Sequence, residues 1–123
     1  MKAIPKRLLP SKVSYKEYTP DTGEGATYKD IVYLENVKIE EKKLFSMTKD
    51  GNEIVGSAML FYDLINSKGL SGKPTNQSEV IYEDRTYHIV DTDILRANSD
   101  IAHHYEILLK WEFLILLKML LVG

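Results

Sequence analysis

The sequence contains no cysteine, and this absence removes three kinds of chemistry. A disulfide framework, thiolate ligation of zinc and a cysteine nucleophile all need a thiol. The chain also lacks an excess of basic residues, since 16 Lys and Arg stand against 18 Asp and Glu for a formal net charge of −2. A dedicated duplex-binding domain would carry a basic surface. The composition therefore argues against that class of protein.

Catalytic and metal-binding motifs are scarce as well. The chain has no glycine-rich phosphate loop, no dinucleotide fingerprint, no serine-hydrolase elbow and no H-E-x-x-H pair of histidines. His103 and His104 are adjacent, so on a strand they should point to opposite faces and should not ligate one metal together. His88 could join one of the two, but a structural or solvent-facing role is the simpler interpretation. Asp91 and Asp93 share a face and could hold a divalent cation, but they are more simply a solvated strand end. We expect no enzyme, no cofactor and no metal site, because no face is predicted to collect three ligands.

The chain is long enough for one domain with a small core, at 123 residues with 44% hydrophobic and 28% charged residues. We place this domain at residues 1–110, with a basic N-terminal arm at 1–12 and a hydrophobic extension at 111–123. The arm can contact phosphate, an acidic surface of a neighbouring subunit, or only water, and we favour a solvated arm. Its apolar step Leu8-Leu9 is too short for a secretory signal, so we expect a protein that works in the cytoplasm where it is made.

The clearest local structure is a hairpin over residues 78–93. Side chains alternate along a strand, so one face of this hairpin should be apolar. Its members are Val80, Tyr82, Tyr87 and Ile89. A two-residue loop at Glu83-Asp84 would join the arms, with Asp84 at a position that requires a positive φ. A hairpin is marginal alone, so the rest of the chain must supply further strands.

Further strands are predicted over residues 13–18, 28–42, 53–65 and 103–109. Residues 53–65 also fit a helix, but Gly56, the aromatic residues and the preceding Asp-Gly turn favour a strand. This strand would be apolar on both faces, one for the core and one for a partner chain. The candidate subunit-interface residues are Val55, Met59 and Phe61. The fold class is all-β, a small antiparallel barrel or sandwich of about six strands with long loops.

Two segments do not fit a compact strand pattern. Residues 66–77 form a long polar loop with one large apolar residue, Leu70, and such loops are commonly functional or disordered. Residues 110–123 are almost wholly apolar. They are either a helix or strand packed against a neighbouring subunit, an irregular extension, or a membrane anchor. The stretch is short and interrupted for a membrane span, so we expect no membrane association.

Six segments carry a family resemblance, among them Lys-Arg-Leu-Leu-Pro-Ser-Lys-Val-Ser-Tyr at 6–15, Ala-Met-Leu-Phe-Tyr-Asp at 58–63 and His-His-Tyr-Glu at 103–106. The others are 28–30, 34–40 and 81–90. In this order they resemble the minor capsid proteins of tailed phages and prophages of Gram-positive bacteria, which are similar to head-completion, or stopper, proteins of the head–tail connector. The resemblance covers residues 2–109. The family usually has Gly where this chain has Asp84, and the end from Trp111 has no counterpart, as in a lineage-specific extension or a shifted reading frame.

The resemblance implies a homo-oligomeric ring in the virion, at the junction of head and tail. The expected partners are a portal or adaptor protein on the head side, a tail-side connector protein, and packaged DNA held in the channel without sequence specificity. A loop from each subunit would close the channel and would be disordered in the free subunit. The candidate gating residues are Lys68, Gly69, Leu70, Gly72 and Lys73, and residues 49–52 are the second choice.

A small nucleic-acid-binding barrel of OB or SH3-like type is the alternative. Tyrosines on strands could stack on bases, and Lys68 and Lys73 could contact phosphate. The tyrosines in question are Tyr15, Tyr33, Tyr82 and Tyr87. The negative charge counts against this alternative.

Overall fold

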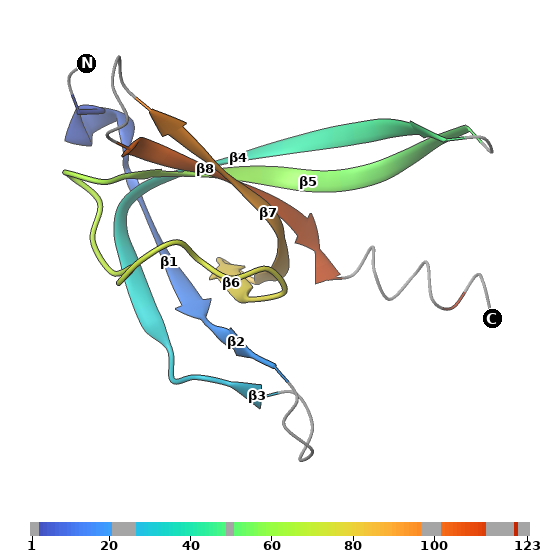
Figure 1. Ribbon diagram of the computed structural model, residues 1–123, viewed down its shortest axis with the longest axis horizontal. Coiled ribbons are helices and arrows are strands. Elements are labelled where there is room, and N and C mark those ends of the chain that lie inside the picture. Colours follow the sequence, from blue (N-terminus) through green and yellow to red (C-terminus); the bar gives the residue numbers. More distant parts are fainter. Residues whose placement is uncertain (1–2, 21–26, 49–50, 97–101, 113–119, 121–123) are drawn as a thin grey trace.

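The protein is a six-stranded antiparallel barrel in a computed structural model (Figure 1). The structure describes residues 3–20, 27–48, 51–96, 102–112 and 120, with only the backbone for 43–48 and 51–55. The strands are β1 (Ser11–Lys16), β2 (Tyr18–Thr19), β3 (Thr27–Tyr28), β4 (Val32–Thr48), β5 (Gly51–Asp63), β6 (Glu79–Tyr82), β7 (Arg85–Arg96) and β8 (Ala102–Trp111). The barrel order is β1-β4-β5-β8-β7-β6, and β2 with β3 forms a separate two-stranded sheet. The all-β prediction is confirmed.

Strand β1 closes the barrel because it pairs on both sides. Tyr15 lies opposite Val32 of β4 on one side and opposite Val80 of β6 on the other. A closed barrel leaves no strand edge free along the paired region. Backbone pairing alone therefore closes the barrel in a chain that has no cysteine.

The core consists of alternate side chains from all six barrel strands, as the period-2 pattern predicts. Val80 pairs with Tyr87 across β6 and β7, and both are buried together with Ile89. The whole cluster is Val13, Tyr15, Leu34, Val37, Ala58, Leu60, Tyr62, Val80, Tyr87, Ile89, Tyr105, Ile107 and Leu109. Residues 53–65 are mostly a strand, because β5 alternates buried Ala58 and Leu60 with half-buried Met59.

The turn between β6 and β7 corrects one detail of the sequence analysis. Tyr82 pairs with Arg85, so the predicted two-residue loop at Glu83-Asp84 is confirmed. The positive φ falls on Glu83, at 54°, and not on Asp84. The left-handed backbone conformation is therefore at the first loop residue, Glu83, one position before the residue that the sequence predicted.

The β4–β5 hairpin continues beyond the barrel. Pairing of β4 with β1 ends at Val37, and pairing of β5 with β8 begins at Ala58. Beyond these points the two strands pair with each other, as far as Thr48 opposite Gly51. Figure 1 shows this part extending away from the barrel. Strand β4 thus runs beyond the expected end at 42, because its register with β5 continues without β1. It also starts later than the expected 28, since Tyr28 belongs to β3, which pairs with β2.

The N-terminal arm packs on the barrel, unlike the solvated arm that we favoured. A short 3-10 helix, Lys6–Leu8, leads to Leu9, whose side chain is only 2% exposed. Lys6 and Arg7 remain exposed. Leu9 anchors the arm, while Leu8 and the two charged side chains face solvent. At the other end, residues 113–119 and 121–123 of the predicted extension lie outside the described residues.

Candidate functional site

The end of β5 is organised by the buried carboxylate of Asp63, which is 0% exposed. Its Oδ2 atom accepts hydrogen bonds from the backbone N–H groups of Ile65 at 3.1 Å and Asn66 at 2.8 Å. Its Oδ1 atom accepts one from the backbone N–H of Ile4 at 3.0 Å. A buried carboxylate must be satisfied by donors, and these three bonds fix the turn and the N-terminal arm together.

The first end of loop 66–77 is tied to β4. Lys68 and Glu35 exchange two backbone hydrogen bonds, of 2.9 and 3.0 Å. Gly69 then adopts φ 124°, and a Cβ atom there would lie 2.4 Å from the carbonyl oxygen of Tyr33. Only glycine combines this conformation with such a close approach. The loop therefore enters at a fixed point.

The second end of the loop is tied by Ser78, which is buried. The Ser78 hydroxyl accepts a hydrogen bond from the Tyr18 N–H at 2.9 Å and lies 2.6 Å from the Thr75 hydroxyl. The Gln77 N–H donates to the Ile89 carbonyl at 2.8 Å. Between these anchors Gly72 is exposed, with no atom within 4 Å of a Cβ placed on it.

Leu70, expected to be available to neighbouring copies, is instead half-buried and packs against its own core. Its backbone N–H donates to the Tyr62 hydroxyl at 3.1 Å. Burial raises the pKa of Tyr62, so this hydroxyl stays neutral. The loop has enough apolar surface to dock on a single subunit, and contact of Leu70 with neighbouring copies in a ring stays a prediction.

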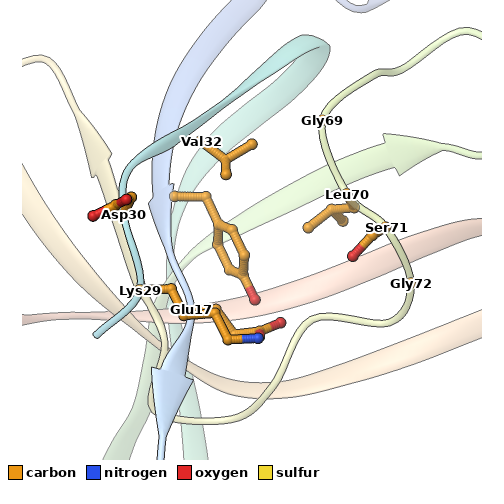
Figure 2. Close-up of a pocket in the computed structure, with 9 residues that line it drawn as sticks. Glu17, Lys29, Asp30, Val32, Gly69, Leu70, Ser71 and Gly72 are labelled. Atoms are coloured by element: carbon orange, nitrogen blue, oxygen red, sulfur yellow. The ribbon is translucent and has the colours of Figure 1, made fainter. Parts of the chain in front are cut away.

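Hollows flank the middle of the loop on both sides. A cavity of about 120 Å³ separates it from the two segments that carry Glu17 and Lys29, and Figure 2 shows Leu70 and Ser71 facing that cavity. A second hollow, of about 400 Å³, lies between the loop and Tyr62. The middle of the loop is therefore bordered by open volume while its ends are held.

The outer face of β5 carries the predicted interface residues. Met59 and Phe61 are half-buried on this face, since Leu60 and Tyr62 point to the core. Phe61 lines a groove of about 150 Å³ with Ile4, Leu8, Leu9 and Lys38. Val55 lies on β5, but its side chain is outside the described residues.

A family comparison identifies the class of this barrel. A family model described as minor capsid protein matches residues 5–109. The chain belongs to the minor capsid protein family. Membership implies a structural part of the virion and not an enzyme. Searches of curated proteins and of solved structures found no significant match.

Two tyrosines proposed as base-stacking platforms are in the core of this minor capsid protein. Tyr15 is 4% exposed and Tyr87 1%, so neither ring can stack on a base. Tyr82 also packs against the core, and Tyr33 is exposed with the Lys12 amine 4.8 Å from its ring centroid. The nucleic-acid-binding alternative is not favoured.

Within the described residues, no helix is long and apolar enough to cross a membrane.

The histidines lie differently from the sequence prediction. The Nδ1 atoms of His103 and His104 are 2.7 Å apart, although adjacent strand residues were expected to diverge. The pair stands at the start of β8, where the rings turn edge to face. Burial lowers the pKa of His104, and the neighbouring His103 lowers it further.

Asp91 and Asp93 are both exposed on β7, on the shared face that was predicted.

One group of possible metal ligands was missed by the sequence analysis. Glu79, His88 and Glu112 place their ligand atoms within 4.8 Å of one another. The expectation that no face collects three ligands is therefore wrong. His88 and Glu112 lie 24 residues apart, and only the register of β7 with β8 brings them together. A sequence pattern alone could not supply that register.

Proposed function

We propose that this minor capsid protein is a head–tail connector component of the head-completion, or stopper, type. It forms a ring below the portal, joins the head to the tail and helps to retain packaged DNA. Its partners are a portal or adaptor protein on the head side and a connector protein on the tail side. The observation that carries the proposal is membership of a capsid family together with a barrel that keeps apolar surface on its outer wall.

Two outward features suit contacts between ring subunits. Met59 and Phe61 present apolar area beside the groove lined by Leu8 and Leu9. The β4–β5 hairpin beyond the barrel has backbone edges that no other described strand pairs. A closed ring needs two different, complementary surfaces on each subunit. The outer wall of β5 and the projecting hairpin are such a pair.

The loop over residues 66–77 is the proposed gate. Its anchored ends keep the loop in register on every subunit, while Gly69–Gly72 lines two hollows. In the ring, Leu70 exchanges its contact with its own core for contacts with neighbouring copies. Such an exchange of one packed state for another is a common switching device. Lys68 and Lys73 are exposed and bring positive charge to the channel without reading sequence.

Deletion of the gene tests the connector role in the virion. Without this protein, cells should accumulate filled heads that carry no tail and lose their DNA. Removing residues 71–73 tests the gate separately, because the anchors at Lys68 and Thr75 would remain. Heads made with this variant should join tails but leak DNA, while Gly72→Ala should behave as the parent does. If the shortened variant retains DNA, another segment is the gate.

A further inference from the structure

A cluster of three side chains stands on the outer wall of the barrel, just beyond the second end of loop 66–77. Glu79 of β6 lies opposite His88 of β7, and His88 lies opposite Lys110 of β8. Val80, Tyr87 and Leu109 point into the core, so their neighbours Glu79, His88 and Lys110 point outward. Glu112 follows two residues after Lys110. Three neighbouring segments thus bring two carboxylates and an imidazole to one place.

The separations suit a small metal ion. The His88 Nε2 and Glu112 Oε1 atoms are 3.3 Å apart, and the Glu79 carboxylate completes a group within 4.8 Å. Two ligands on a tetrahedral zinc, with bonds of about 2.0–2.1 Å, lie about 3.3 Å apart. The His88–Glu112 separation already matches one edge of that tetrahedron. A small rotation of the Glu79 side chain would complete three ligands.

The electrostatics of the cluster also favour a cation. In the described part of the chain, no Lys or Arg forms an ion pair with Glu79 or Glu112. Partial burial raises the pKa of Tyr28, and the charge of Glu79 and to a lesser extent that of Glu112 raise it further. The two carboxylates thus create a negative potential at the site, which Lys16 opposite Glu79 and Lys110 opposite His88 offset in part without a direct ion pair. All three ligand residues are half-buried, which limits screening by solvent.

We propose that Glu79, His88 and Glu112 bind one divalent transition-metal ion of the zinc class, with water at the remaining position. The mixed nitrogen and oxygen ligands favour Zn²⁺ or Co²⁺ over Mg²⁺ and Ca²⁺, which prefer oxygen ligands alone. Glu112 directly follows β8, so the ion clips the exit of the chain from the barrel to the β6–β7 hairpin. This site has no role in chemistry and does not depend on the connector function.

Calorimetric titration of the full chain with zinc chloride tests the site, after removal of any affinity tag and treatment with chelator. We expect saturable binding that weakens at least tenfold in Glu79→Gln, His88→Ala and Glu112→Gln. Two matched controls, His103→Ala in the other histidine cluster and Glu83→Gln in the same hairpin, should change the affinity less than twofold. Magnesium should give no saturation at millimolar concentration.

Thermal melting provides a second readout, which does not require a binding constant to be measured. Zinc should raise the melting temperature of the parent protein but not that of Glu79→Gln. The glutamine variants keep the side-chain shape, and circular dichroism in the absence of metal confirms that they fold. No saturable zinc binding by the parent would overturn the proposal. So would zinc binding that survives Glu79→Gln and Glu112→Gln but is lost in His103→Ala.

Discussion

The carboxylate of Asp63 holds the backbone of Ile4 at 3.0 Å, across 59 residues of sequence. The same side chain accepts two further backbone N–H groups from the turn that leads into loop 66–77. One buried residue therefore links the N-terminal arm, the end of β5 and the first anchor of the proposed gate. Removing the carboxylate would leave these three backbone N–H groups without their acceptor.

Asp63→Ala should lower the free energy of unfolding by about 2–4 kcal/mol, because a hydrogen bond to a charged group contributes about 1.5–3 kcal/mol and the loss is only partly relieved by water. Asp63→Asn should fall between this variant and the parent, since it retains one acceptor oxygen. Denaturant unfolding of the three proteins measures the order. Equal stability of Asp63→Ala and the parent would mean that these bonds contribute little.

Gly69 and Gly72 provide a matched pair within one loop. Gly69→Ala should cost about 1–3 kcal/mol, because the residue has φ 124° and its Cβ would meet the Tyr33 carbonyl. Gly72→Ala should be neutral or slightly stabilising, since its Cβ would meet open space. Thermal melting of both variants compares them. A similar loss in the two would show that the loop does not dock as described.

The β6–β7 turn offers a stabilising change. Glu83→Gly should raise the free energy of unfolding by up to about 1 kcal/mol, because Glu83 has a positive φ that glycine adopts without steric cost. Asp84→Gly should give no gain, since Asp84 has no such conformation and glycine adds entropy to the unfolded chain. Denaturant unfolding distinguishes them. A larger gain from Asp84→Gly would restore the original sequence prediction.

The lowered pKa of His104 predicts a pH dependence of stability. Because the folded state holds this pKa below its usual value of about 6.5, the unfolded chain binds more protons below that pH. The stabilisation from neutral His104 is therefore complete above about pH 6.5 and is lost as the pH falls through the lowered folded value. Melting temperatures between pH 7.5 and 5 should fall less for His104→Gln than for the parent. Parallel curves would contradict the prediction.

The sequence predicts the strands well because their side chains alternate. Val80, Tyr87 and Ile89 were assigned to one face, and all three are buried. Strand β5 was recognised as apolar on two faces, and it places Leu60 in the core and Phe61 on the outer wall. These features depend on local periodicity, which a single sequence carries.

The features that sequence reasoning missed depend on long-range register. Asp63 looks like an ordinary turn residue until the N-terminal arm brings Ile4 to it. The Glu79, His88 and Glu112 group needs the pairing of β7 with β8, which includes a register shift between Ile89 and Asp91. Leu70 was assigned to neighbouring subunits because a loop's docking on its own core leaves no local pattern. Periodicity predicts which face of a strand each side chain occupies, but it does not predict which other strand pairs with it.

The mass of the native protein, measured alone and then mixed with its portal-side neighbour, tests the connector proposal most directly. We predict a single chain of 14.1 kDa alone and a closed ring on the neighbour after mixing. Phe61→Asp should block the ring through the charge on the β5 wall, while Val90→Asp, at a position 39% exposed on β7, should not. A parent protein that remains a single chain in the mixture would contradict the proposal.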